Sequence, residues 1–139
     1  MRSRALVLAA TAAAAAILTW RLVSAPDVRE DVPPEFAGRR NPLAGPEAIA
    51  AGDRLFHANC ATCHGEQADG RGPAAAGLIP PPTDFRGGPV LAQHSDAYLF
   101  YRVTTGKPGT AMPSFHGALG DSERWQVIAY LRSLATAAR

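Results

Sequence analysis

Lysine is almost absent from this chain of 139 residues. Lys107 is its single lysine, and eight basic residues balance eight acidic ones between positions 44 and 139. A nucleic-acid partner calls for a basic stripe along one face, and long-range electrostatic steering calls for a strongly charged surface. The composition supports neither, so we expect no nucleic-acid partner.

Cysteine is equally scarce, because Cys60 and Cys63 are the only two in the chain. They cannot form the framework of several disulfides that staples many small secreted domains. A structural zinc site needs about four ligands, usually from two paired clusters, and the sequence has no second cluster. A dithiol redox pair normally follows a strand in a βαβ pattern. The sequence shows no such pattern and no convincing alternating strand, so we predict an all-α domain.

The two cysteines lie in the segment Cys60-Ala61-Thr62-Cys63-His64, which has the pattern C-x-x-C-H. This pattern is typical of covalent attachment of a c-type haem, in which the thiols add to the two vinyl groups and the histidine reaches the iron. A plain disulfide would leave the histidine unexplained. We therefore predict one covalently bound haem c, with the histidine as an axial ligand of its iron.

Residues 1–25 have the features of an export segment. Met1–Arg4 is a short basic head, and residues 5–20 are apolar apart from two threonines. Basic residues before an apolar run keep that end cytoplasmic and place the rest of the chain outside. We therefore predict that the remainder lies on the periplasmic side of a bacterial inner membrane, where covalent haem attachment takes place.

Two fates of this segment fit the sequence. As a helix the apolar run would span roughly 24 Å, which is shorter than a bilayer core of about 30 Å. A retained helix becomes long enough if Arg21 snorkels to the interface. Val23-Ser24-Ala25 has the small residues of a cleavage site, but Pro26 directly after it is unfavourable for cleavage. We favour a retained membrane anchor, with a cleaved signal peptide as the alternative.

A proline-rich segment follows at residues 26–43. Its four prolines stand among residues of mixed charge, a composition that resists both helix and sheet. We predict an extended tether that leads to a haem domain at residues 44–139. An arm that lies on the surface of that domain is the alternative.

Three helices are expected in the haem domain. Pro46, a residue favoured in the first helical turn, begins a helix that runs into the C-x-x-C-H segment. Ser95 can cap a second helix, which stops at Gly106. A third helix begins at positions 120–121 and runs almost to the C-terminus. The glycine- and proline-rich stretch 65–88 is predicted to be irregular loop.

The second axial position of the iron has few candidate ligands. Met1 lies in the export segment, which leaves Met112 as the usable methionine. Pro113 biases Met112 toward an extended backbone, which helps to aim its sulfur. A thioether ligand raises the potential, as expected for an electron carrier, whereas a bis-histidine iron would have a lower one. Three histidines remain as alternative ligands, with the first as the main rival: His116, His94 and His57.

Four segments of the chain carry a family resemblance: Gly52-x-x-x-Phe56 leading into Cys60–Gly65, Pro80–Phe85, Gly106–Phe115 and Trp125–Leu131. On these segments, residues 44–139 resemble a class I c-type cytochrome, close to the mono-haem domains associated with respiratory oxidase assemblies. The resemblance implies a small all-α fold around one covalently bound haem.

The resemblance also implies particular contacts. The first and last helices should cross, with Gly52 meeting residues around Tyr130. A backbone carbonyl near Pro80 should accept a hydrogen bond from the His64 ring and fix its orientation. Arg102 is the expected partner of a haem propionate.

The predicted function is transfer of single electrons between redox protein partners of a respiratory chain, through a His/Met-ligated haem. A ligated iron has no open position for substrate, and the other residues assemble no nucleophile, carboxylate pair or phosphate loop. The chain is therefore predicted to be an electron carrier rather than an enzyme, either free or as a subunit of an oxidoreductase complex. The alternative is a catalytic or sensory subunit that binds a small ligand after Met112 leaves the iron.

Overall fold

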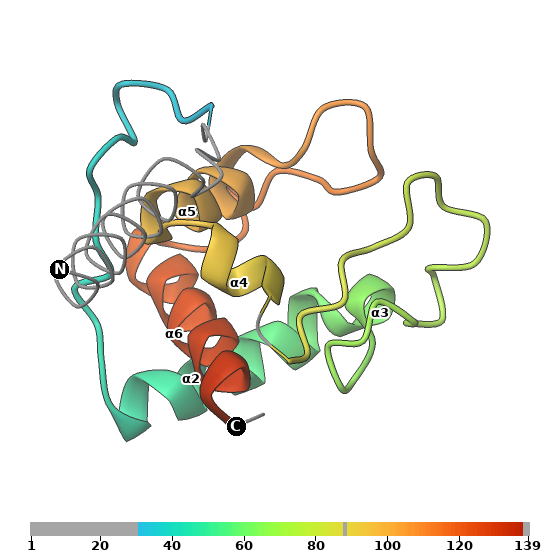
Figure 1. Ribbon diagram of the computed structural model, residues 1–139, viewed down its shortest axis with the longest axis horizontal. Coiled ribbons are helices and arrows are strands. Elements are labelled where there is room, and N and C mark those ends of the chain that lie inside the picture. Colours follow the sequence, from blue (N-terminus) through green and yellow to red (C-terminus); the bar gives the residue numbers. More distant parts are fainter. Residues whose placement is uncertain (1–30, 88, 138–139) are drawn as a thin grey trace, which may run out of the picture.

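The computed structural model describes residues 31–87 and 89–137 of the chain. All regular structure in these residues is helical, as predicted: α2 (Pro46–Asn59), α3 (Ala61–His64), α4 (Pro89–Gln93), α5 (Asp96–Thr105) and α6 (Asp121–Ala137) (Figure 1). The predicted export segment lies outside the described residues. Among the helices that are described, none is both long and apolar enough to cross a membrane.

The crossing of α2 and α6 forms the centre of the fold (Figure 1). Gly52 lies at the crossing, where a Cβ would come within 2.9 Å of the Cβ of Tyr130. One turn further along α2, the Phe56 ring packs against the Tyr130 ring with centroids 5.3 Å apart. The expected contact between the first and last helices is therefore confirmed.

The helix α5 completes the core by packing across α6. The rings of Phe100 in α5 and Trp125 in α6 stack with centroids 4.1 Å apart. Burying large apolar side chains in this way is the main driving force for folding. The largest side chains that are fully buried are Phe56, Phe100, Leu91, Ile128 and Val127.

The ends of α5 follow the sequence signals. The Ser95 hydroxyl oxygen accepts a hydrogen bond from the Tyr98 backbone N–H at 3.1 Å, which caps the first turn. Gly106 ends the helix with a φ of 75°, a left-handed conformation that favours glycine. Both predicted ends are confirmed.

The start of α6 uses a different residue from the usual capping serine or threonine. Gly120 occupies the position before the first helical residue, and its carbonyl accepts from the Arg124 N–H at 3.0 Å. The Glu123 carboxylate reaches back and accepts from the Gly120 N–H at 2.8 Å. This is one half of a capping box, so a carboxylate from the first turn does the capping.

Two long loops extend from the same side of the helices, one at residues 65–87 and the other at residues 106–120 (Figure 1). The first leads from α3 to α4, a short helix that the sequence did not predict. The second joins α5 to α6 and contains Met112.

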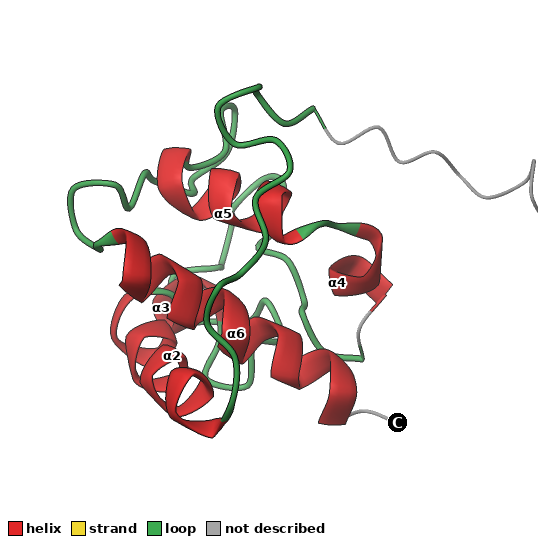
Figure 2. Cartoon of the chain, turned by 90° about the vertical axis from the view of Figure 1, so that its left-hand side faces the viewer, coloured by secondary structure: helices red, strands yellow, loops and turns green. Residues whose placement is uncertain are grey.

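The proline-rich segment does not form a free tether within the described residues. From residue 33 to residue 45 it runs as an arm along the domain to the start of α2 (Figure 2). The Phe36 ring packs against Tyr101 and Phe100 of α5, with centroids 5.1 and 6.3 Å apart. Leu43 packs against the core. The prediction of an extended tether is therefore wrong for this part, because two apolar side chains of the segment gain burial by docking.

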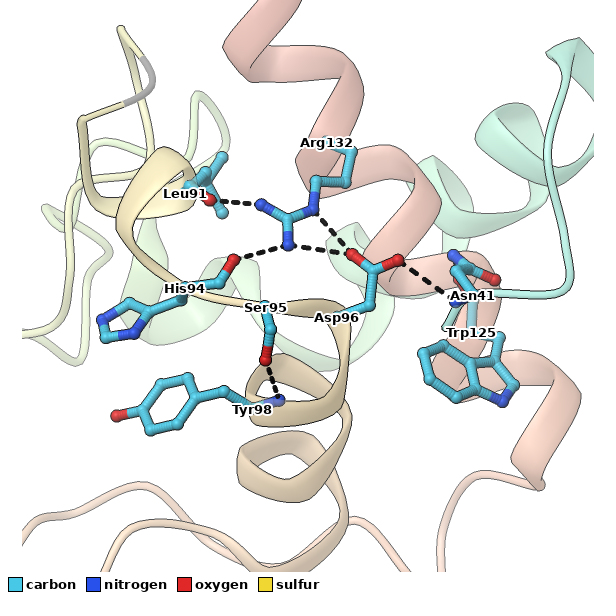
Figure 3. A network of polar contacts seen from close by, with 8 residues as sticks. All are labelled: Asn41, Leu91, His94, Ser95, Asp96, Tyr98, Trp125 and Arg132. Carbon is cyan, nitrogen blue, oxygen red and sulfur yellow. Dashed lines mark hydrogen bonds and ion pairs between the residues drawn. The ribbon is translucent and has the colours of Figure 1, made fainter. Parts of the chain in front are cut away.

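A polar network ties the arm to the helices (Figure 3). Asp96 accepts from the Asn41 backbone N–H at 3.1 Å and from the Arg132 side chain at 2.8 and 2.9 Å. The Asn41 side-chain amide donates to the Trp125 carbonyl at 2.9 Å. Arg132 also donates to the carbonyls of Leu91 and His94. One arginine thus holds α4, α5 and α6 together.

Candidate functional site

The C-x-x-C-H segment begins where α2 ends. The Cys60 N–H donates to the Phe56 carbonyl at 2.7 Å, and the His64 N–H donates to the Cys60 carbonyl at 2.9 Å. These bonds fold residues 61–64 into the single turn α3. Because both bonds are backbone bonds, the turn sets the spacing of the two thiols and the imidazole.

The two cysteines are half-buried, and no disulfide joins them. Burial raises the pKa of the Cys60 thiol to about 11, and the neighbouring Cys63 adds to the rise. A dithiol redox pair needs a thiolate whose pKa is lowered. The surroundings of Cys60 therefore disfavour a redox dithiol and leave a neutral thiol next to an apolar space.

That space is an open cleft with a volume of about 180 Å³. Its lining is mostly apolar with a few polar groups, which is typical of sites that bind a small molecule or cofactor. The C-x-x-C-H turn lines one side and the loop with Met112 lines another, so Cys60, Cys63, His64 and Met112 all face one cavity. The remaining lining residues are mostly apolar: Leu78, Pro80, Pro81, Pro82, Val103, Ala111, Pro113 and Phe115, together with Asn59, Thr83, Lys107 and Thr110.

The His64 ring is held by a backbone carbonyl. Its Nδ1 lies 3.1 Å from the carbonyl oxygen of Thr83. A carbonyl can only accept a hydrogen bond, so Nδ1 must carry the proton and Nε2 must carry the lone pair. Nε2 is then the atom available to a metal ion.

The sequence expectation was a carbonyl near Pro80, and the carbonyl that faces the imidazole belongs to Thr83. Pro80 lines the cleft instead, and the chain runs three residues further before a carbonyl faces the imidazole. Prolines 80–82 form an irregular stretch whose path the sequence does not define, so only the approximate position of the carbonyl could be predicted.

Two aromatic rings pack beside the His64 imidazole. The Phe85 ring lies 4.9 Å away and the Phe56 ring 6.4 Å away between centroids. Burial lowers the pKa of His64, while the Thr83 carbonyl opposes that shift. The neutral imidazole is the form that binds metals, so the surroundings favour ligation.

Hydrogen bonds within the loop and from the loop to α5 fix the backbone around Met112. The Thr110 hydroxyl donates to the Lys107 carbonyl at 2.7 Å and accepts from the Met112 N–H at 3.2 Å. The Lys107 N–H in turn donates to the Met112 carbonyl at 3.2 Å. Further along, the Ser114 hydroxyl donates to the Thr104 carbonyl at 2.7 Å, which pins the loop to α5.

The other predicted site residues lie elsewhere. Of the three alternative histidines, none is among the described residues that line the cleft. Arg102, expected near a haem propionate, is also missing from the lining. Its guanidinium lies over the rings of Tyr101 and Tyr98, at 4.5 and 5.1 Å from the centroids. The guanidinium is thus stacked on two aromatic rings of its own helix, while its Nε is buried without a hydrogen-bond partner.

Several residues that build the cleft have no site role in the prediction from the sequence. Thr83 and Phe85 hold the His64 ring, and Leu78, Val103 and Phe115 supply apolar walls. The signal for Phe85 was its place at the end of the Pro80–Phe85 segment. The walls carry no signal of their own, because apolar residues in a loop or helix are equally expected in the core.

The residues present fit a haem. Two thiols spaced by one helical turn, an imidazole with a free Nε2 and a thioether face one apolar cleft. The helical fold and this site have the pattern of a class I c-type cytochrome domain. The chain belongs to the family described as cytochrome c oxidase, cbb3-type, subunit III, whose family model matches residues 47–131. Its cofactor is one covalently bound haem c, and a cytochrome c domain of this family transfers electrons through that haem.

The chain is also similar to individual known proteins. The chain is 37% identical over 87 residues to cytochrome c6 of Bumilleriopsis filiformis, which covers 61% of this chain and 90% of the relative. Among solved structures, it resembles a chain of the reducing HAO-like protein complex of Kuenenia stuttgartiensis, with 32% identity and a TM-score of 0.53. That match covers 69% of this chain and 49% of the other. Cytochrome c6 of the diatom Phaeodactylum tricornutum matches with 32% identity and a TM-score of 0.48, covering 66% of this chain and 98% of the other.

Proposed function

We propose that this chain is a mono-haem electron carrier in which Cys60 and Cys63 form the thioether links and His64 and Met112 are the axial ligands. The observation that carries the proposal is the common cleft that these four side chains line. Haem c, when bound there, supplies one-electron chemistry between ferric and ferrous iron, and a Met/His ligand pair raises its potential.

The chain's own residues would prepare this site in three ways. The Thr83 carbonyl holds the proton of His64 on Nδ1 and leaves Nε2 free for the iron. The hydrogen-bonded loop would hold Met112 in the wall of the same cleft. The apolar lining would lower the polarity around the iron, which is one of the means by which a protein sets a potential.

The surroundings of the carrier are also part of the proposal. We place residues 44–139 on the periplasmic side of the inner membrane, attached through residues 1–25 as a retained anchor. Redox proteins are its partners, consistent with a relative that belongs to a reducing protein complex. The family name supports a place as a subunit or close neighbour of an oxidase assembly.

Optical spectra of the full chain, made in a host with haem-attachment machinery, test the ligands. The wild-type protein should show a c-type haem spectrum with the weak far-red band of methionine-ligated ferric iron. Met112→Ala should lose that band, gain rapid binding of carbon monoxide when reduced, and have a lower potential. Leu78→Ala is the matched control, because Leu78 lines the cleft without an atom that binds iron.

Two results would contradict the proposal. A Met112→Ala protein with an unchanged spectrum and potential would show that another residue ligates the iron. Rapid binding of carbon monoxide to the reduced wild-type protein would show an open iron and favour the catalytic or sensory alternative.

A further inference from the structure

The buried arginine Arg124 faces a histidine at the end of the Met112 loop. The guanidinium belongs to α6, and the residue is 2% exposed. Its Nη1 lies 3.1 Å from Nδ1 of His116. A guanidinium has only donors, so Nδ1 of His116 must accept this hydrogen bond. The single proton of the neutral imidazole then sits on Nε2.

Neighbouring groups keep Arg124 in this position. The guanidinium pairs with the Asp121 carboxylate one turn earlier in α6. It also lies over the Phe100 ring at 5.1 Å from the centroid. A buried charge is costly to leave without partners, so the side chain cannot turn away without losing both contacts. The donor that faces His116 is therefore a fixed feature of the fold.

The arrangement at His116 is the reverse of that at His64. The Thr83 carbonyl is an acceptor, which puts the His64 proton on Nδ1 and leaves a lone pair on Nε2. The Arg124 donor puts the His116 proton on Nε2 and leaves no lone pair on that atom. Its only lone pair, on Nδ1, is occupied by the guanidinium. His64 thus has a lone pair available for iron, and His116 has none.

His116 lies close enough to Met112 in the chain for the availability of its lone pair to matter for ligation of the iron. It follows Phe115, which lines the cleft, and it lies four positions beyond Met112 in the same loop. Its backbone N–H donates to the Ser114 hydroxyl at 3.3 Å. A movement of this loop that withdraws the methionine also carries the histidine, and imidazole is a strong ligand of haem iron.

We propose, in addition to the Met112 ligation proposed above, that Arg124 excludes His116 from the iron by holding it in the Nε2–H tautomer. Arg124 is a positioning residue in this scheme and touches neither the haem nor the iron. Without this donor, the proton of His116 would be free to move to Nδ1 through solvent, and Nε2 would compete with the Met112 sulfur as a ligand of the haem iron. A His/His ligand pair would give the haem a lower potential than a His/Met pair.

Four variants of the full haem-loaded chain test this. Arg124→Leu removes the donor and keeps an apolar side chain in the buried position, and the Asp121 carboxylate that loses its partner is exposed to solvent. His116→Ala removes the competitor alone. The double variant Arg124→Leu with His116→Ala removes both, and Arg124→Leu with His94→Ala is the matched control. The readouts are the far-red band of the ferric protein and the redox potential.

Arg124→Leu should lose most of the far-red band and have a lower potential, while His116→Ala should retain both. The double variant with His116→Ala should regain the band and the potential, but the variant with His94→Ala should not. An Arg124→Leu protein that keeps the full band overturns the proposal. A double variant that stays without the band also overturns it, because the arginine would then act only on folding.

Nitrogen NMR of the histidine rings in the reduced wild-type protein gives an independent test that needs no variant. We expect an Nε2–H tautomer for His116 and an Nδ1–H tautomer for His64. An Nδ1–H tautomer at His116 overturns the proposal even if Arg124→Leu fails to fold. Absence of the far-red band from the wild-type protein would instead refute Met112 ligation, and the tautomer of His116 would still decide the role of Arg124.

Discussion

The backbone carbonyl of Gln126 in α6 lies directly against Gly52 in α2, so closely that a Cβ at position 52 would overlap its oxygen. The two helices therefore approach to a distance that only glycine permits. Since α3 continues the chain from α2, the position of the C-x-x-C-H turn depends on this crossing.

Replacing Gly52 with alanine should destabilise the protein. The added methyl group meets a backbone carbonyl that cannot move without displacing α6, and overpacking of this kind costs about 1–3 kcal/mol. Alanine gains up to about 1 kcal/mol in helix propensity over glycine, so we expect a net loss of about 1–2 kcal/mol in urea unfolding. Gly117→Ala is the control, since a Cβ there has no neighbour within 4 Å. Equal stability of the two variants would show that the helices can separate without cost.

Replacing Gly106 with alanine should disturb Met112 rather than the whole fold. A Cβ at Gly106 would lie 2.6 Å from the Met112 carbonyl oxygen and 2.7 Å from the Pro113 carbonyl carbon. Gly109→Ala is a matched control, because both glycines have a φ near 75° but a Cβ on Gly109 has no neighbour within 4 Å. Both variants should lose roughly 1–2 kcal/mol of stability to left-handed backbone strain. Only Gly106→Ala should weaken the far-red band; a similar loss in both would assign the effect to strain alone.

Removing the side chain of Arg132 should destabilise the protein by about 2 kcal/mol. The Arg132→Ala variant removes the arginine donor from the Asp96 carboxylate and from the carbonyls of His94 and Leu91, in a half-buried position. Arg86→Ala is the control, because its pair with Asp84 is exposed and screened by solvent, so its loss should cost less. Urea unfolding of both variants measures the difference. Equal losses would show that the network of Figure 3 acts as an ordinary surface pair.

His57 should make stability depend on pH. Its two ring nitrogens face the carbonyls of Asp53 and Glu66 at 2.8 and 3.1 Å. Only the imidazolium can donate to both. The Asp53 carbonyl is the main cause of the raised pKa of His57, and burial opposes it. The stabilisation is therefore complete below the unfolded value of 6.5 and is lost as the pH rises through the higher folded pKa.

The comparison of wild type with His57→Gln measures this effect. At about pH 5 the wild-type protein should be more stable than His57→Gln, by no more than about 1 kcal/mol because the His57 side chain is partly exposed. This difference in stability should vanish at about pH 9. Asp53→Asn keeps the backbone carbonyl and should keep most of the pH dependence. Loss of the whole dependence in Asp53→Asn would assign it to the carboxylate instead.

The helices that the sequence predicted are those whose ends carry a side-chain signal. Pro46 in the first turn, Ser95 as a cap and Gly106 as a stop are local features, and they act through the residue's own backbone and its nearest turn. The short helix α4 has too few residues for a periodic pattern. It is held by tertiary contacts, including the Arg132 donor to the Leu91 carbonyl.

The residues of the site also fall into those that a local sequence pattern predicts and those that only the folded chain brings together. The C-x-x-C-H turn could be predicted, because its spacing is a property of five consecutive residues. The cleft joins that turn to a loop about 50 positions further along the chain, and the partners of each histidine depend on that folding. Neither the Thr83 carbonyl beside His64 nor the Arg124 donor beside His116 has a sequence signal, since each is a long-range or buried contact.

Docking of the arm, residues 33–45, limits the distance over which the domain can move. A flexible stretch as long as residues 31–45 would have a mean end-to-end distance of about 20 Å and would let the domain swing through that radius. Because Phe36 and Asn41 attach the arm to α5 and α6, any segment before it leaves from a fixed point on the surface. The docked arm therefore limits how far the domain, and with it the mouth of the cleft, can move. The orientation of the cleft toward a partner then depends on this attachment as well as on diffusion.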